Sequence, residues 1–579
     1  MTRHQTAQAS PWPRPASALR EVLAEGYSSA WLRSDLLAGV VVGIVALPLS
    51  MALAIASGVA PMHGLYTAIV AGGLTPLVGG SRFQVTGPTA AFVVVLSPIS
   101  HRFGIGGLAL ASLMAGLLLF AMGLFRMGRY IEFVPYPVTT GFTAGIAVVI
   151  ATLQVKDLIG LSVQEMPEHF VERVQALARA LPTMQSADLA IGLLTLVVLL
   201  LWPRVTRRVP APLVALVVGA SAAAFAARFV PDFDAATIAS RFEYSVHGSV
   251  GHGIPPLPPL PVWPWSLPGH DGRPIGLSFA LVRELMPAAF AIAALGAIES
   301  LLSAVVADGM TGRKHDPDAE LMAQGTGNVA APFFGGFAAT GAIARTATNV
   351  RSGARSPIAA FVHAAVVLLA VLLVAPVLGW LPMASLAALL LFVAWNMAEL
   401  DHFAHMLKVA PRSDVAVLLT CFFLTVLFDM VVAVSVGVVM AALLFMQRMA
   451  EVSEVRLVDA HPLGLTRPLP KGVIAYEIAG PLFFGAAQKA MAALQSVDKA
   501  VRVVILDLRS VPMLDATGLV GLESAFERLN RAGVLVVIGG AQPQPLRTMA
   551  RAGWGDRKGR ITVYGSFDRA VEEVYKAFE

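Results

Sequence analysis

The sequence has a single cysteine and few charged residues. Cys421 is alone among 579 residues, which excludes an intramolecular disulfide and a cysteine-based zinc or iron–sulfur site. Charged side chains make up 14% of the chain, whereas ordinary soluble proteins carry about 25%. The 42 lysines and arginines and 37 aspartates and glutamates leave a net charge of +5, with no basic run. These shortages exclude an ordinary soluble protein and a nucleic-acid binder with a basic face.

Several functional signatures are also missing. The chain has no G-x-x-x-x-G-K-[ST] phosphate loop and no H-E-x-x-H zinc motif, which argues against a primary pump or a metalloenzyme. Residues 1–30 contain no apolar core of a cleavable signal peptide. We therefore expect a cytoplasmic amino terminus, no enzymatic activity, no metal and no cofactor.

Apolar residues are abundant: they make up 56% of the chain, and the mean hydropathy is +0.71. Apolar stretches close to the length of a membrane span, about 20 residues, recur between short breaks. They predict fourteen helices, at residues 35–57, 62–79, 86–100, 104–125, 135–156, 187–203, 210–230, 285–306, 321–336, 340–350, 355–376, 377–398, 413–431 and 433–449. The chain is therefore expected to be a polytopic α-helical protein of the lipid bilayer.

Basic residues occupy every second connection between the predicted helices. They include Arg126, Arg129, Arg204, Arg207, Arg208, Arg313, Lys314, Arg351, Arg355, Lys408, Arg412 and Arg448. Because short cytoplasmic loops are rich in lysine and arginine, this alternation predicts that both termini are cytoplasmic. The connection at about 231–284 is rich in proline, glycine and tryptophan and is expected to be irregular and extracytoplasmic.

The charged residues are concentrated at the carboxyl end. The last 109 residues hold 25 charges, whereas the preceding 470 hold 54. This difference divides the chain into a cytoplasmic segment (1–30), a transmembrane domain (31–450), a linker (451–470) and a soluble domain (471–579). In the soluble domain, strand-like runs alternate with helical ones, including a helix at 486–497, so a small α/β domain is expected.

Two of the predicted membrane segments are too short to cross the hydrocarbon as helices. Both open with Thr-Gly, at Thr86 and Thr340, and both follow a Gly-Gly pair, at Gly79 and Gly335. Paired, glycine-interrupted segments in two halves of a chain indicate a transporter site between two half-helices. The amino ends of such helices attract anions. The alternative is two glycine breaks in closely packed helices.

Glu299 lies in the middle of a predicted apolar helix, beside Ser300 and one turn before Ser303. An ionisable group inside the membrane is costly and indicates a function, and burial favours its protonated form. We expect Glu299 to carry a coupling proton, with Ser303 close by. Sodium coupling and a purely structural role remain alternatives.

Arg345 lies on the second short segment, one and a half turns after Thr340. A guanidinium can pair with a carboxylate or sulfate through two hydrogen bonds. The alternatives are pairing with Glu299 or extension toward the cytoplasm.

Asp35 and Asp429 lie near helix ends and are expected to be caps or interfacial groups. Asp308 is expected to begin the loop that follows the Glu299 helix.

Four stretches resemble the SulP (sulfate permease type) anion transporters with a C-terminal STAS domain. They are APMHGLYTA from Ala60, GGSRFQVTGPTAAFV from Gly79, the block from Leu295 to Gly336, and the soluble domain. Within the family, the similarity is greatest to bacterial C4-dicarboxylic acid transporters. The resemblance implies a seven-plus-seven inverted repeat, with helices 3 and 10 as half-helices. It also implies a core domain (helices 1–4 and 8–11) and a gate domain (helices 5–7 and 12–14).

The resemblance also implies a substrate site between the amino ends of helices 3 and 10, with Glu299 as the coupling carboxylate. Its residues would be Pro88, Thr89, Ala90, Thr340, Gly341, Ala342 and Arg345. The chain departs from many members in having Leu49, Leu53 and Ala344 where more polar or aromatic residues are common. A less polar wall favours an organic anion over bare sulfate.

The run from Asp507 to Leu519 resembles the STAS signature. The serine that is phosphorylated in related anti-sigma antagonists is here Ala516, between Asp515 and Thr517, so that switch is lost. We expect Thr517 to be a helix N-cap, and phosphorylation of Thr517 is the alternative. The domain is expected to mediate homodimer contacts or to bind a cytoplasmic protein.

The residues and the resemblance together predict a proton-coupled importer of C4-dicarboxylates such as succinate, fumarate, malate or aspartate, in the bacterial inner membrane. It would work by an elevator-type alternating-access mechanism. A bicarbonate or sulfate transporter coupled to sodium or protons is the first alternative. A membrane sensor that signals through the soluble domain is the second.

Overall fold

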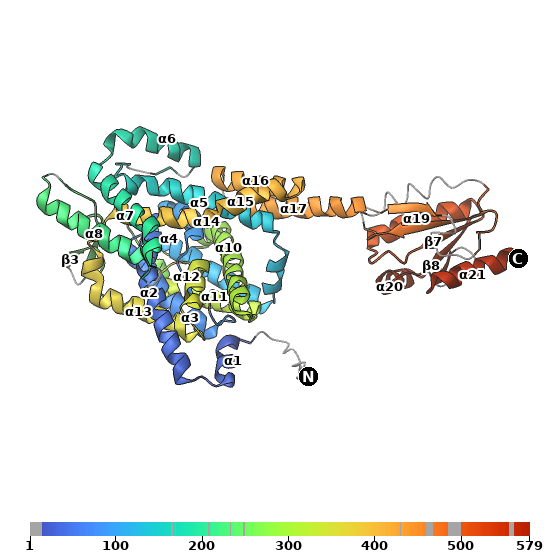
Figure 1. Cartoon of the computed structure of the whole chain (residues 1–579), viewed down its shortest axis with the longest axis horizontal. Helices are drawn as coiled ribbons and strands as arrows, with labels where there is room; N and C mark the ends of the chain where they lie inside the picture. Colours follow the sequence, from blue (N-terminus) through green and yellow to red (C-terminus); the bar gives the residue numbers. More distant parts are fainter. Residues whose placement is uncertain are drawn as a thin grey trace. The chain divides into compact units, whose positions relative to one another are not determined.

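The computed structural model describes residues 14–163, 166–167, 169–206, 209–231, 233–246, 249–428, 430–452, 454–458, 467–483, 500–554 and 561–579. Contacts divide the chain into two units, Met1–Val438 and Val439–Glu579 (Figure 1). Each unit is described by itself.

The amino-terminal half of the first unit is almost entirely helical. Its helices are α1 (Ser17–Glu25), α2 (Ser29–Ala56), α3 (Pro61–Val78), α4 (Ala90–Leu124), α5 (Tyr136–Leu158), α6 (Phe170–Ala180), α7 (Ser186–Val205) and α8 (Ala211–Phe229). Short 3-10 turns lie at η1 (Gly128–Phe133) and η2 (Leu181–Thr183). Ser28 caps α2 by accepting the Trp31 N–H at 3.3 Å, and a proline opens α3, as expected at helix starts.

The long connection predicted to be irregular contains some regular structure. It holds helix α9 (Ile238–Arg241), strands β2 (Glu243–Val246) and β3 (Ser249–His252), and the 3-10 turn η3 (Pro264–Ser266). The two strands pair antiparallel.

The second half of the first unit begins with a long helix. Its helices are α10 (Phe279–Thr311), α11 (Pro317–Ala330), α12 (Ile343–Arg351), α13 (Ile358–Leu378), α14 (Met383–Ala398), α15 (Leu400–Val409), α16 (Arg412–Leu427) and α17 (Met430–Val452), with the 3-10 turn η4 (Ala331–Phe334) after α11. Because α10 continues to a left-handed glycine cap at Gly312, Asp308 lies in its last turn, and the prediction that it begins a loop was wrong.

Nine of the described helices are long and apolar enough to cross a membrane. The count of fourteen spans stays a prediction. Its segments 86–100 and 104–125 correspond to the two helical parts of α4, which the non-helical backbone of Gly104 separates (φ +68°, ψ −173°). Helices α6 and α15 were not predicted from the sequence, because their apolar stretches are short.

The predicted helices that open at Thr86 and Thr340 both begin later than expected. The Thr-Gly pairs form two-residue strands instead, β1 (Thr86–Gly87) and β4 (Thr340–Gly341), which pair antiparallel. Thr86 faces Gly341 and Gly87 faces Thr340. The helical part of each segment starts only after its strand, at Ala90 and Ile343.

The most extensive helix packing falls into two groups. One group joins α2, α3, α4, α10, α11, α12 and α13, and the other joins α5, α7, α8, α14 and α16. The paired strands β1 and β4 contact α3 and α10 in the first group. They are therefore enclosed by that group, and Thr86 and Thr340 are both buried.

Asp35 is fully buried near the start of α2 and holds the turn before α13. Its carboxylate accepts the N–H groups of Arg355 (2.6 Å) and Ser356 (3.2 Å), just before α13. It also accepts the hydroxyls of Ser356 (2.5 Å) and Tyr27 (2.9 Å). Asp35 therefore binds the turn before α13 and does not cap that helix, whose N-cap is Pro357, while Asp429 lies outside the described residues.

The second unit contains a five-stranded sheet in the order β5-β6-β7-β8-β9. Its elements are β5 (Glu454–Val458), β6 (Val473–Ala479), β7 (Val503–Asp507), α19 (Ala516–Arg531), β8 (Leu535–Gly539), α20 (Pro543–Arg551), β9 (Ile561–Tyr564) and α21 (Phe567–Phe578). Strand β5 is antiparallel to β6, and the other neighbours are parallel. Apolar residues of α19 and α20 pack in one core of the sheet, and those of α21 pack in another.

Three expectations for the second unit meet different outcomes. Strand β5 lies in the segment expected to be a linker, 451–470. The helix predicted at 486–497 lies outside the described residues. The N-cap of α19 is Asp515 and not Thr517, because the Asp515 carboxylate accepts the Gly518 N–H at 2.7 Å. Ala516 and Thr517 are exposed in the first turn.

Candidate functional site

The two Gly-Gly pairs permit close backbone approaches before each short strand. A Cβ on Gly79 would lie 2.9 Å from the Glu320 carboxylate, and one on Gly80 would overlap the Asp316 carbonyl. Gly335 has a φ of +70°, which other residues rarely adopt. The glycines therefore let the chain turn tightly into the strand pair.

The strand pair brings the amino ends of α4 and α12 to the same place. The Ala342 N–H donates to the Val85 carbonyl at 2.9 Å, and the Val85 N–H donates to the Thr346 hydroxyl at 3.1 Å. Thr89 and Ala342 occupy the N-cap positions, and neither side chain caps its helix. First-turn N–H groups have no partner within a helix, so the positive ends of two helix dipoles converge here.

Three residues expected to bind substrate use their polar groups within the protein. The Gly341 N–H donates to the Ser300 hydroxyl at 3.0 Å, and the Ala342 N–H is taken by Val85. The Thr340 hydroxyl lies 2.6 Å from the Ser300 hydroxyl and donates to the Gly296 carbonyl at 3.2 Å. The contacts with Ser300 and Gly296 secure β4 to α10.

The first-turn N–H groups of α12 belong to the residues that follow, Ile343, Ala344 and Arg345. The side chains of Ile343 and Ala344 are exposed. Sequence reasoning missed Ile343 and Ala344 as backbone donors, because it started the helix at Thr340. On the other side, Ala90 provides the first N–H of α4.

Arg345 connects the two half-helices. Its side chain is 4% exposed, and its Nη2 donates to the Pro88 carbonyl just before α4. Its Nη1 is buried and has no hydrogen-bond partner among the described residues. A Cβ on Gly87 would lie 2.5 Å from that nitrogen, so any other residue at this position would require the guanidinium to shift. Arg345 therefore keeps one buried donor available between the helix ends.

Glu299 lies on α10 and reaches the start of α4. The Thr89 hydroxyl donates to its Oε2 at 2.8 Å, and its charge interacts with that of Arg345. The structure thus brings Thr89, Glu299 and Arg345 together, as the sequence predicts. The buried Ser303 hydroxyl donates to the Thr346 hydroxyl at 3.0 Å and not to Glu299.

A cavity of about 390 Å³ lies between the two helix groups. Val94 of α4, Val149 of α5, Ala291 of α10 and Val426 of α16 contribute to its mostly apolar lining. On α4 the lining runs from Val94 to Ile99, which begins about one helical turn after Ala90.

The fold and the site define a membrane transporter for small anions. The chain belongs to the sulfate permease family, whose model matches residues 32–421, and a STAS domain model matches residues 467–570.

Two relatives and one solved structure show the extent of the similarity. The putative sulfate transporter YvdB of Bacillus subtilis is 40% identical, over 94% of this chain and 98% of that protein. The bicarbonate transporter BicA of Picosynechococcus is 29% identical, over 88% of this chain and 89% of that protein. The murine Solute Carrier 26 family member A9 anion transporter, in the inward-facing state, superimposes with a TM-score of 0.81 at 18% identity, over 96% and 94% of the two chains. Since that identity is low, the last likeness shows the fold alone.

Proposed function

We propose that this protein couples the uptake of C4-dicarboxylates, such as succinate, fumarate, malate or aspartate, to the entry of protons. The observation that carries the proposal is the strand pair, which places two half-helix amino ends, Arg345 and Glu299 around one point. One end provides backbone donors and the guanidinium, and the other is tied to a carboxylate that can take a proton.

The charge balance favours a divalent anion when Glu299 is protonated. Each helix amino end contributes roughly half a positive charge, and Arg345 adds one. The site then carries about two positive charges, which a dicarboxylate or sulfate neutralises. When Glu299 is ionised, about one charge remains, so binding of a divalent anion and binding of a proton support each other.

The neighbouring apolar surface favours an anion with a carbon chain. Leu53 of α2 is buried and Ala344 is small, at positions where the family resemblance leads us to expect more polar or aromatic residues. The apolar cavity beside Val94 adds to this surface. Apolar contact surface strengthens binding of an organic anion but not of bare sulfate.

Bicarbonate or sulfate transport is the second candidate, and the names of the relatives favour it. The backbone donors and Arg345 serve an inorganic anion equally well, with sodium or protons as the coupling ion.

Alternating access follows from the two helix groups. The strand pair, Glu299 and Arg345 all belong to the group of α2, α3, α4 and α10 to α13, so this group would carry the anion as one body. The group of α5, α7, α8, α14 and α16 would form the surface along which it moves. This is an elevator-type mechanism with the site travelling in the core.

The test is transport by the purified protein in liposomes. Labelled succinate uptake is measured with an inward proton gradient and is challenged with unlabelled fumarate, sulfate and bicarbonate. We expect uphill succinate uptake that fumarate suppresses and that collapses with the gradient. Suppression by bicarbonate or sulfate but not by fumarate supports the second candidate. Uptake driven by a sodium gradient would show that sodium, and not the proton, is the coupling ion. Absence of any anion flux contradicts transport and favours a sensor.

The surroundings of the protein form part of the same proposal. The alternation of basic loops supports cytoplasmic termini, and the bacterial relatives support a bacterial inner membrane as the location of the membrane unit. The second unit would mediate a homodimer or bind a cytoplasmic protein. Crosslinking in membranes of the full chain, compared with a chain that ends before residue 454, tests its share in dimer contacts.

A further inference from the structure

Helix α11 carries three buried polar side chains on one face. Glu320, Gln324 and Asn328 are spaced by four residues, and each is at most 1% exposed. Residues four apart lie above one another on a helix, so the three form a continuous polar row. None of them takes part in the anion site as described above, and burying polar groups is costly unless each has partners.

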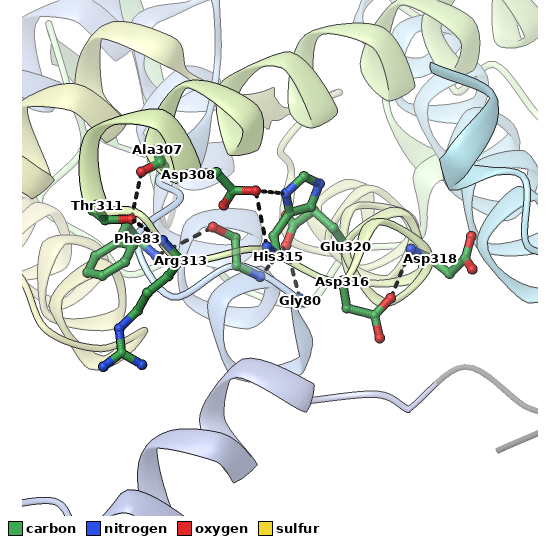
Figure 2. A network of polar contacts seen from close by, with 11 residues as sticks. Gly80, Phe83, Ala307, Asp308, Thr311, Arg313, His315, Asp316, Asp318 and Glu320 are labelled. Atoms are coloured by element: carbon green, nitrogen blue, oxygen red, sulfur yellow. Dashed lines mark hydrogen bonds and ion pairs between the residues drawn. The ribbon is translucent and has the colours of Figure 1, made fainter. Parts of the chain in front are cut away.

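Glu320 holds the turn before the first strand. Its Oε2 accepts the N–H groups of Gly80 (3.0 Å) and Ser81 (3.1 Å). The Gly80 carbonyl in turn accepts the Asp316 N–H at 3.1 Å, just before α11. Figure 2 shows Glu320 and Gly80 beside the α10–α11 connection, where His315 and Asp308 are also joined, at 2.8 Å.

Gln324 holds the first strand itself. Its Nε2 donates to the Thr86 hydroxyl at 2.9 Å and to Glu320 Oε1 at 3.1 Å. Thr86 is the residue of β1 that faces Gly341 of β4. The contact therefore acts directly on the strand pair.

Asn328 holds the approach to the second strand. Its Oδ1 accepts the Ala339 N–H at 2.7 Å, and its Nδ2 donates to the Ala339 carbonyl at 2.8 Å. The amide thus pairs with both backbone groups of the residue before β4. Its Nδ2 also donates to the Gln324 carbonyl at 2.8 Å, which fixes the side-chain orientation.

We propose that Glu320, Gln324 and Asn328 form a polar ladder that sets the distance and register between the two half-helix amino ends. One helix holds both segments, which are about 250 residues apart in the chain, against a single rigid face. These three are positioning residues: they act on the anion through β1 and β4 and do not touch it. The proposal rests on the anion site of the proposed function, but not on which anion is carried.

The first test separates positioning from general stability. Gln324→Met removes the donor to Thr86 and keeps the volume, and Thr86→Val removes its partner. We expect each change to raise the KM for anion uptake about tenfold with the maximal rate within threefold. The double variant should be no worse than either single one, because both remove the same contact. The role of Gln324 would be overturned if the increases in KM of the two single variants multiplied in the double variant. It would also be overturned if a variant lost maximal rate at unchanged KM.

The matched control lies on the same helix. The Thr326 hydroxyl bonds only its own helix, donating to the Met322 carbonyl at 2.8 Å, so Thr326→Val should leave KM within twofold. A tenfold change in this control would mean that any substitution on α11 disturbs transport, and the ladder would be rejected.

The second test does not depend on transport. Hydrogen exchange in the purified full chain is followed at the segments 80–86 and 336–342, with α14 as the internal reference. Asn328→Leu should speed exchange at 336–342 at least tenfold and leave α14 unchanged. Asn328→Asp, which keeps the acceptor for the Ala339 N–H, should give an intermediate rate and covers the case in which the leucine variant does not fold.

Exchange at wild-type rates in both variants would overturn the ladder. The KM arm uses succinate, bicarbonate or sulfate, whichever the wild type carries. If the wild type carries none of these, the proposed function fails, and the exchange arm still decides whether the ladder holds the two segments.

Discussion

The two half-helices have the same frame but different chemistry. Before each helix a glycine pair, a short extended segment and a Thr-Gly strand follow one another, and the two strands pair with each other. At the start of α4, however, Thr89 is bound to the Glu299 carboxylate, whereas α12 carries the Arg345 guanidinium. The backbone arrangement is shared, and the charges are divided: one end lies beside a carboxylate and the other carries a guanidinium.

The segments before the strands are also held differently. The first, around Arg82, is bound by charged groups: Arg82 pairs with Glu25 at 2.6 Å and with Glu21 at 3.0 Å, both on α1. The second is held by neutral groups, since the Phe337 N–H donates to the Thr67 hydroxyl at 2.8 Å and Ala339 pairs with Asn328. Each prediction below changes one side of this comparison.

Glu299→Gln should have the largest effect, on the α4 side. The glutamine keeps an oxygen that accepts the Thr89 hydroxyl, but it cannot release a proton. We expect accumulation driven by a pH gradient to be lost, while anion binding stays within threefold of wild type. Uptake against a gradient and equilibrium binding are measured on the same preparation. Unchanged uphill uptake would make Glu299 structural.

Arg345→Ala should come next, on the α12 side. A lost charge-assisted hydrogen bond costs about 1.5–3 kcal/mol, so anion affinity should fall by roughly an order of magnitude or more. Competition binding in detergent measures it. Arg351→Ala, at the exposed end of the same helix, serves as the control and should bind normally. Equal affinity in Arg345→Ala and wild type would place the arginine outside the site.

Gly87→Ala should have a smaller effect on the same guanidinium. The added Cβ would lie 2.5 Å from Arg345 Nη1, and the flexible side chain can move away at some cost. We expect anion affinity to fall several-fold, less than in Arg345→Ala. Gly73→Ala is the matched control, because its Cβ would meet only the Ala364 side chain, at 3.5 Å. Similar affinities in the two glycine variants would argue against this packing.

The smallest effect should come from the ion pairs that Glu21 and Glu25 of α1 form with Arg82 and Arg313. We expect their contribution to stability to change only at acidic pH. Hydrogen bonds from Arg82 and then Arg313 lower the pKa of Glu25 from 4.5 to about 2. A lowered pKa stabilises the folded state above the ordinary value, and this stabilisation is lost as pH falls from about 4.5 toward 2. Hydrogen exchange of α1 should therefore be constant between pH 5 and 8, after correction for intrinsic rates.

Glu25→Gln removes that charge at every pH, so α1 should exchange faster than wild type already at pH 7. If α1 in the wild type loosens between pH 7 and 5, a group other than Glu25 controls its contact with Arg82.

Much of this protein could be predicted from local patterns. Long apolar stretches identified most helices, and Glu299 and Arg345 stood out because charges are scarce in such stretches. The starts of the half-helices were placed too early, at Thr86 and Thr340, because nothing local shows that Thr-Gly pairs with another Thr-Gly over 250 residues away. The cap of α19 was assigned to Thr517 and not to Asp515, a shift of two residues.

By itself, the sequence determined that most of the chain lies in lipid, that two segments are interrupted, and which two charges lie near them. These are consequences of composition and spacing, which act within a few turns of a helix. Only the tertiary structure decided that Thr89 binds Glu299, that Arg345 binds Pro88, and that Gly341 and Ala342 give their N–H groups to the protein. Such contacts depend on how distant segments pack, because a hydrogen bond forms only where packing brings donor and acceptor within about 3 Å.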